Sequence, residues 1–183
     1  MTVVIGLDLS STATGVATDV GTSTIKPKGT LHARARAIAV EVSRVVLARS
    51  RPLVVMEAIG TRHVQTAIAI ATVHALVRDR LHDIGIEPVE VPPAVLKKWA
   101  TGKGNSDKTA MILSATRAGW DAPEGATDDQ ADAWWLYTIG CAITGRSHVS
   151  QTVLRTAIVA DLFAHHGTAN ATLRPFADRQ GDA

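Results

Sequence analysis

The chain has little cysteine and few aromatic residues. Among its 183 residues there is one cysteine, Cys141, and aromatic residues make up 4%. A single cysteine excludes a disulfide framework within the chain, so a reducing, cytoplasmic location is expected. Cys141 is most simply explained as a small buried hydrophobe.

Long apolar runs are absent as well. The longest weakly polar stretch, residues 67–77, contains Thr72 and His74 and falls well short of the roughly 18 residues that a membrane span needs. The first apolar run follows no basic segment and is interrupted early by Asp8, which argues against a signal peptide. We therefore expect no membrane association.

Neither sign of charge dominates. Nineteen lysines and arginines oppose 17 acids, and the formal net charge of +2 does not by itself indicate a nucleic-acid partner. The distribution is more informative, because one short window holds Lys97, Lys98, Lys103 and Lys108. With 46% hydrophobic residues, the chain is long enough for one domain with a sizeable core.

Hydrophobic periodicity predicts an alternation of strands and helices. Strands are expected at residues 3–9, 14–19, 22–27, 53–57 and 86–91. Helices are expected at residues 31–50, 64–83, 92–102, 106–117 and 128–144. A meander followed by β-α-β units predicts an α/β fold: a mixed five-stranded sheet, three antiparallel strands then two parallel, flanked by helices.

Two acids stand at the ends of predicted strands. Asp8 interrupts the apolar first strand, where a buried carboxylate is costly unless it is paired or binds a metal. Glu57 ends the apolar fourth strand, at the edge where open α/β sheets place their ligand sites. Taken alone, Asp8 is also explained as a turn-capping residue and Glu57 as an ordinary strand-end residue. If both strands are central, the two carboxylates meet at one sheet edge.

Three further acids lie at the start of the fifth predicted helix. Thr127 and Gln130 match a capping box, which places Asp128 and Asp129 in the first turn, where the helix dipole favours acids. Asp132 has no such explanation. It shares a helix face with Asp129 at i, i+3, and the i, i+4 pair with Asp128 is an alternative that the geometry also permits.

Carboxylates in these positions form a hard-oxygen donor set, which suits Mg²⁺ or Mn²⁺ rather than zinc. Two divalent ions about 3.5–4 Å apart can activate a water and stabilise the leaving oxygen of a phosphodiester. Bound metal would also reverse the repulsion between the acids and a phosphate. The nearby lysines would complete the charge match.

These residues resemble the motifs of the RuvC-type Holliday-junction resolvases, a family of the ribonuclease H-like/integrase superfamily. Five pieces match in order, spanning residues 3 to about 143: Gly6-Leu7-Asp8 with Thr14-Gly15, Glu57, Val95-Leu96-Lys97-Lys98, Thr101 to Lys108, and Asp129-Gln130-Ala131-Asp132-Ala133. The Thr-Gly-Lys-Gly-x-x-x-Lys element is specific, whereas a lone Asp-x-x-Asp is weak. A bacteriophage member of the family is expected, acting in the host cell cytoplasm.

The resemblance implies a role for each matching residue. The four catalytic metal ligands are matched by Asp8, Glu57, Asp129 and Asp132, which favours Asp129 over Asp128 and implies two Mg²⁺ ions, with Mn²⁺ as a substitute. Lys97 and Lys108 match residues that contact the DNA backbone, and Lys108 is also expected to help stabilise the transition state. The expected DNA-binding set is completed by Lys98, Lys103 and Arg62.

The family works as a homodimer that nicks two opposing strands of a four-way junction and leaves 5′-phosphate and 3′-hydroxyl ends. The resemblance therefore implies an Mg²⁺-dependent endodeoxyribonuclease of DNA recombination and repair. Its expected partners are four-way junctions, other branched DNA and a second copy of the chain.

The sequence departs from the family pattern in two places. Bacterial members carry an aromatic residue shortly after the acid of the fourth strand, but residues 58–63 contain none. Strong sequence preference is therefore not expected, and branched or flap DNA becomes a candidate substrate. Residues 147–183 extend beyond the match. We expect them to form an amphipathic helix and a weakly ordered tail, outside a nuclease domain of residues 1–146.

Three other functions share parts of these motifs. The turn of residues 8–15 also resembles the phosphate loop of the actin and sugar-kinase superfamily, but such kinases need a duplicated domain for which 183 residues leave no room. A ribonuclease H-like relative acting on RNA, or a transposase-like core, would share the metal site. A non-catalytic junction-binding protein is the third alternative, and the presence of all four acids argues against it.

Overall fold

The structure, a computed structural model, describes residues 2–60 and 64–167 of the chain. Its elements follow one another in this order: β1 (Val4–Asp8), β2 (Thr14–Thr18), β3 (Gly21–Ile25), α1 (Leu31–Leu47), β4 (Leu53–Glu57), α2 (Val64–Asp83), β5 (Val89–Val91), α3 (Pro93–Thr101), α4 (Lys108–Arg117), α5 (Asp128–Ile143) and α6 (Val153–His166). Arg62 and the predicted weakly ordered tail from Thr168 lie outside the described residues.

The five strands form one mixed sheet in the order β3-β2-β1-β4-β5. β1 pairs antiparallel with β2, and β2 pairs antiparallel with β3, whereas β4 is parallel to both β1 and β5. The predicted α/β fold with a mixed five-stranded sheet is therefore confirmed. Because β1 and β4 are parallel neighbours, their carboxyl ends lie side by side, and each strand ends on an acid.

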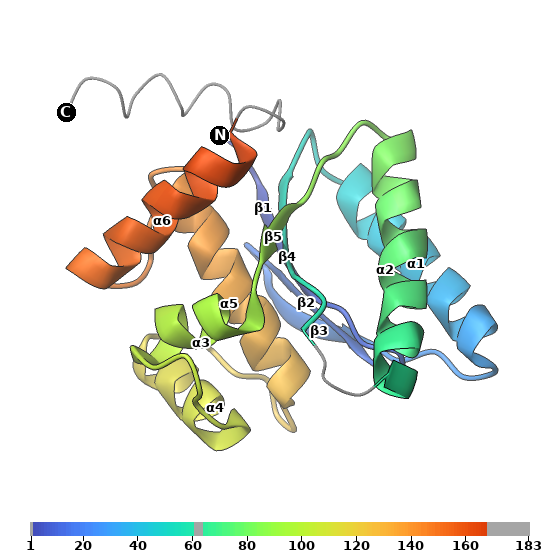
Figure 1. Ribbon diagram of the computed structural model, residues 1–183, viewed down its shortest axis with the longest axis horizontal. Helices are drawn as coiled ribbons and strands as arrows, with labels where there is room; N and C mark the ends of the chain where they lie inside the picture. The colour runs from blue at the N-terminus through green and yellow to red at the C-terminus, as the bar shows by residue number, and fades with distance from the viewer. Residues whose placement is uncertain (1, 61–63, 168–183) are drawn as a thin grey trace.

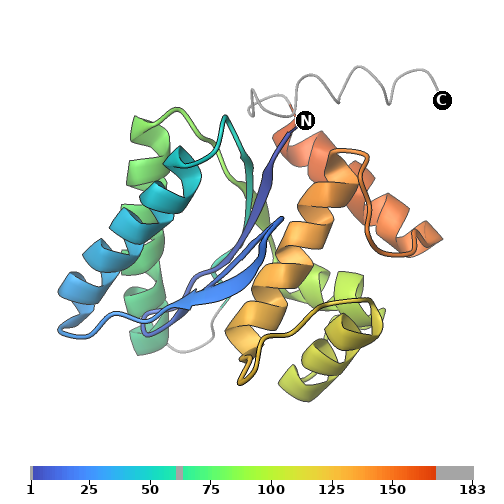
Figure 2. The ribbon, with the colours of Figure 1, turned by 180° about the vertical axis from the view of Figure 1, so that it is seen from behind.

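Helices cover both faces of this sheet (Figures 1 and 2). One face is covered by α1 and α2, and the other by α5 together with α3, α4 and α6. Alternation along the strands divides the core between the two faces. Ile5 and Leu7 pack with the α1–α2 side, whereas Val4 and Leu53 pack with the α5 side.

Helix α5 lies directly against β1 and β2, and glycines permit the close approach. A Cβ atom at Gly6 would stand 2.2 Å from the carbonyl oxygen of Ala133, and one at Gly15 would stand 1.9 Å from that of Asp129. No side chain fits at such distances. The glycines of the Gly-Leu-Asp and Thr-Gly motifs therefore serve as docking positions for α5, and they hold its first turn over the carboxyl end of β1.

Most elements differ from the predicted bounds by a few residues, and the differences at β5 and α4 have a clear cause. β5 is shorter than the expected residues 86–91, because the Ile86 N–H donates to the Leu81 carbonyl (2.8 Å) and closes the end of α2. α4 begins at Lys108 rather than at residue 106, because the Asp107 side chain is its N-cap. At β5 a backbone group assigned to the strand is used by α2, and at α4 a residue assigned to the helix is its cap.

The helix expected beyond residue 146 is α6. Its residues Ile158, Val159 and Leu162 are buried in the apolar cluster that also holds α5. Arg155 ties it to α3 by donating from Nε to the Trp99 carbonyl (3.0 Å). The division into residues 1–146 and 147–183 stays a prediction. Among the described residues no helix is long and apolar enough to cross a membrane.

Candidate active site

The carboxyl ends of β1 and β4 bring Asp8 and Glu57 together. In the parallel register Leu7 is paired with Met56, so the next residues on the two strands are neighbours. Side-chain alternation directs Glu57 to the same face as Val55, which packs on the α5 side of the sheet. The Asp8 side chain is buried there, and the residue is 8% exposed. The two strand-end acids therefore meet at one edge, as predicted.

The first two turns of α5 carry Asp129 and Asp132 to the same edge. The Thr127 N–H donates to Gln130 Oε1 (3.0 Å), which confirms the predicted capping box. Asp132 Oδ1 is buried and has no hydrogen-bond partner among the described residues. A buried carboxylate oxygen without a partner is costly, so this atom lacks a donor or a cation.

Burial and the neighbouring acids, Asp128 included, raise the pKa of all four carboxyls. Burial and then the charge of Glu57 raise the pKa of Asp8 well above its ordinary value. Burial and Asp132 raise the pKa of Glu57 to about 7. Burial and Asp128 raise the pKa of Asp132 to about 6, and the same two causes raise that of Asp129. The carboxyls therefore share one electrostatic site, which retains protons near neutral pH unless a cation is bound.

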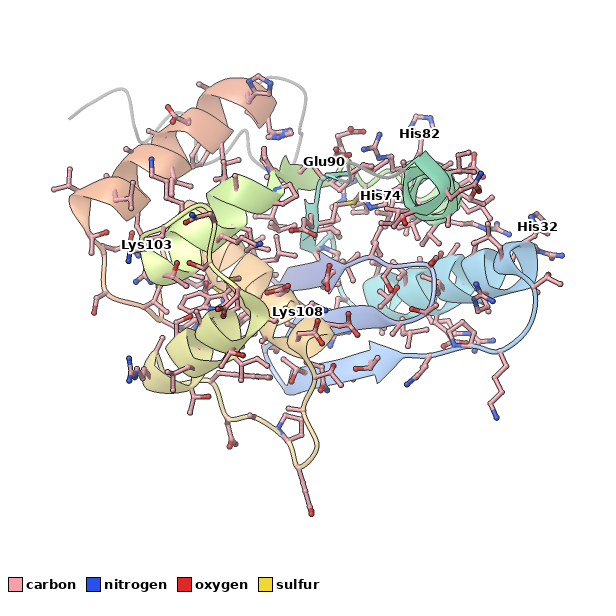
Figure 3. The ribbon with its side chains drawn as sticks, turned by 60° about the horizontal axis from the view of Figure 1, so that its bottom comes forward. His32, His74, His82, Glu90, Lys103 and Lys108 are labelled. Carbon is pink, nitrogen blue, oxygen red and sulfur yellow. The ribbon has the colours of Figure 1, made fainter. Side chains whose placement is uncertain are left out.

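Two lysines of the predicted window act on these acids. Lys97 lowers the pKa of both Glu57 and Asp132, so its charge lies close to them. Lys108 forms an ion pair with Asp128, and this hydrogen bond raises the pKa of Lys108. Figure 3 shows Lys108 beside the first turns of α5.

The other two lysines of the window lie elsewhere. Lys98 and Lys103 are exposed, and neither contributes to the pKa shifts of the four acids. Figure 3 shows Lys103 on the loop between α3 and α4, away from Lys108. The structure thus brings Lys97 and Lys108 to the acids but not Lys98 or Lys103.

Sequence reasoning missed two charged contacts at this edge. Asp128, which the helix dipole explains, is the partner of Lys108, and it raises the pKa of Asp132 more than Asp129 does. Lys26, directly after β3, lowers the pKa of Asp129. The predicted meander could have revealed Lys26, because the first and third strands of a meander end at the same sheet edge. The partner of Asp128 is set by the packing of α4 against α5, which no spacing of residues in the sequence predicts.

The chemistry of the donor set fits a hard divalent cation. The set consists of clustered carboxylates with raised pKa values, and it includes the unpartnered Oδ1 of Asp132. Within residues 2–60 and 64–167, no group of three or more His, Cys, Asp or Glu side chains is arranged to hold a metal ion. The acids therefore supply suitable ligands, and their side chains would have to turn toward a common centre to coordinate one.

Solved structures match this chain, although no protein-family model and no curated protein does. The Thermus thermophilus RuvC structure matches with a TM-score of 0.60 and 20% identity, over 79% of this chain and 97% of that one. The chain has the RuvC fold. T. thermophilus RuvC in complex with Holliday junction substrate matches with a TM-score of 0.62 and 19% identity, over 93% of this chain and 99% of that one.

The match to RuvC confirms the ribonuclease H-like architecture that the sequence motifs predict. At 19% and 20% identity the likeness establishes the fold alone. Both RuvC chains are proteins of T. thermophilus, so they lend no support to the expected bacteriophage origin.

Proposed function

We propose that the chain is a structure-selective DNA endonuclease that resolves Holliday junctions, and acts on other branched DNA, by paired nicks leaving 5′-phosphate and 3′-hydroxyl ends. The observation that carries the proposal is the convergence of Asp8, Glu57, Asp129 and Asp132 at one edge of a RuvC-like sheet. A further support is that one matching RuvC protein was solved in complex with Holliday junction substrate.

The acids are proposed to hold two divalent cations, Mg²⁺ with Mn²⁺ as a substitute. When bound, such ions lower the pKa of a water and stabilise the leaving oxygen of a phosphodiester. The unpartnered Oδ1 of Asp132 and the raised pKa of Glu57 support this assignment. A cation would pair with Asp132 Oδ1, and it would offset the charge repulsion that contributes to the raised pKa of Glu57.

The lysines at the site are proposed to receive the phosphate backbone. Lys97 is half-buried beside Glu57 and Asp132, where it offsets part of the acidic charge. The Lys108 side chain is 81% exposed although it is paired with Asp128, so a phosphate has access to its ammonium group. Charge-assisted hydrogen bonds from these groups would orient the scissile phosphate over the carboxylates.

Paired nicks require two active sites. A four-way junction offers two opposing strands for cleavage, and one chain has one such set of acids in the described part of its sequence. We therefore propose that two copies of the chain act together as a homodimer, with one site on each opposing strand.

The test is a panel of labelled substrates: four-way junction, replication fork, flap, duplex and RNA–DNA hybrid, each with Mg²⁺, Mn²⁺ or a chelator. We expect nicks on opposing strands of the junction in either metal and none in the chelator. Cleavage of the hybrid alone would reassign the chain to the ribonucleases. Tight junction binding without cleavage in either metal would identify a binding protein instead.

A further inference from the structure

A basic surface lies across the acids from Lys97 and Lys108. We call it the β3–α1 corner, and it consists of Lys26 and Lys28 from the loop after β3, Arg34 from α1 and Thr12 from the turn between β1 and β2. Together with Pro27 and Gly29 these residues line a cavity of about 370 Å³. Both lysines are exposed.

Strand register places this corner at the edge that carries the acids. Asp8 is paired with Gly15, and the adjacent Thr14 is paired with Ile25, the last residue of β3. Lys26 therefore leaves the sheet at the edge where β1 ends. Burial and Asp128 raise the pKa of Asp129, and Lys26 opposes part of that rise, which agrees with this placement.

The two loops of the corner are held in place by Arg34. Its Nε donates to the Ser11 carbonyl (2.8 Å) and its Nη1 to the Gly29 carbonyl (2.5 Å), so one guanidinium joins the β1–β2 turn to the β3–α1 loop. Ser10 Oγ accepts the Ala13 N–H (3.0 Å) and closes the turn. The lysines thus project from a fixed frame rather than from a free loop.

The lysines of the corner have no direct ion-pair partner among the described residues. None of the ion pairs found within residues 2–60 and 64–167 includes Lys26 or Lys28. The first turn of α1, which begins beside Gly29, contains no acid, so the positive end of the helix dipole adds to that charge. An anion of the substrate is the partner that this arrangement lacks.

We propose that the β3–α1 corner binds the phosphate backbone of the DNA strand that is cut, on the side of the scissile phosphate opposite to Lys97 and Lys108. The inference rests on the proposed function. Basic groups on both sides of the acids suit a continuous polyanion that crosses the sheet edge from α4 to β3, whereas a single free phosphate would need only one of the two sides.

The test measures junction binding as a function of salt for Lys26→Gln/Lys28→Gln in a cleavage-deficient Asp8→Asn parent. Each lost phosphate contact lowers the slope of log K against log salt by about 0.9 on duplex arms. We expect the slope to fall by about 1 to 2 and the affinity at low salt to fall roughly tenfold. Lys26→Arg/Lys28→Arg should keep the slope of the parent.

The matched control is Arg44→Gln/Arg80→Gln, which removes the same charge from the α1–α2 surface. Both arginines line a separate cavity there, and Arg44 lies about 15 Å along α1 from Arg34. The control should retain the slope of the parent. Thermal midpoints close to that of the parent would show that each variant is folded.

Two results would overturn the inference while the proposed function stands. One is an unchanged slope in the lysine variant, and the other is an equal loss in the lysine and arginine variants, which would be a general effect of net charge. A parent that binds neither four-way junctions nor duplex would overturn the proposed function itself, and the inference with it.

Discussion

Lys108 can pair with either of two anions, the Asp128 carboxylate or a phosphate of the substrate. Its ammonium group pairs with Asp128, an acid outside the set that matches the family ligands. A phosphate held over Asp129 and Asp132 would be the second partner, because both carboxylates already act on the pKa of Lys108. Lys108 is thus placed to stabilise charge that develops during cleavage.

Lys108→Ala should lower the cleavage rate more than it lowers junction affinity, because only interactions that strengthen in the transition state accelerate the chemical step. A loss of roughly 10²–10³ in the single-turnover nicking rate is expected, the range for removing one preorganised donor. Arg117→Ala, at the other end of α4, is the matched control. Equal losses in rate and affinity would make Lys108 a backbone-positioning contact instead.

Asp129→Asn should nearly eliminate Mg²⁺-dependent nicking, whereas Asp128→Asn should retain it. The cost of Asp128→Asn should be close to the roughly 0.3–1 kcal/mol that an acid in the first helical turn supplies. Its ion pair adds little, because the Lys108 side chain is largely exposed. Nicking rates and urea unfolding of both variants test these two expectations. An active Asp129→Asn beside an inactive Asp128→Asn would select the i, i+4 pair.

Among the elements, α5 depends most closely on glycine. Gly15→Ala should lower the free energy of unfolding by at least about 1–3 kcal/mol, the usual cost of overpacking, because its Cβ would stand 1.9 Å from the Asp129 carbonyl oxygen. Displacement of the first turn of α5 should also slow nicking. Urea unfolding checks the first effect, with the exposed Ser23→Ala as a control. An unchanged unfolding free energy would contradict the docking role.

Most of the elements could be predicted because their signals are local. Short apolar runs predict the central strands β1 and β4, and the Thr127–Gln130 spacing predicts the start of α5. β5 was predicted too long because the Ile86 N–H has two uses, a strand ladder or the closing bond of α2, and the helix end takes it. Such competition between neighbouring elements is not visible in periodicity.

The candidate site likewise contains residues that local sequence signals reveal and contacts that they do not. Asp8 and Glu57 were found because an acid in an apolar strand is anomalous on its own, and Asp132 because the helix dipole does not explain it. The Lys108–Asp128 pair and the effect of Lys26 on Asp129 were missed, because each joins elements that are distant in the sequence. Only tertiary packing brings these charges together.

For the molecule as a whole, the raised pKa of Glu57 links stability to pH. The pKa of this carboxyl rises from 4.5 to about 7 on folding, so the folded state holds a proton that the unfolded chain releases. The stability from that proton is full below about pH 4.5 and is lost as pH rises toward 7. The difference is on the order of 3 kcal/mol at most.

Glu57→Gln should therefore be more stable than the wild type at pH 7.5 in a chelator and close to it at pH 4.5. Buried His74, whose pKa is lowered to about 4, makes stability rise with pH, opposite to the effect of Glu57. This contribution is the same in both proteins and cancels when they are compared. Urea unfolding at the two pH values gives the difference. Saturating Mg²⁺ should shrink it, since a cation would stabilise the ionised Glu57. A difference that does not grow with pH would contradict the coupling.

The most direct measurement follows nicking of a labelled four-way junction by the wild type and by Asp8→Asn, in Mg²⁺ and in a chelator, with junction binding measured in parallel. The wild type should nick opposing strands in Mg²⁺ only and leave ends that a ligase can seal. Asp8→Asn should not cut, while its binding persists or tightens because a negative charge has left a phosphate site. Cutting by Asp8→Asn near the wild-type rate, or by the wild type in the chelator, would contradict a metal-dependent junction nuclease at this edge of the sheet.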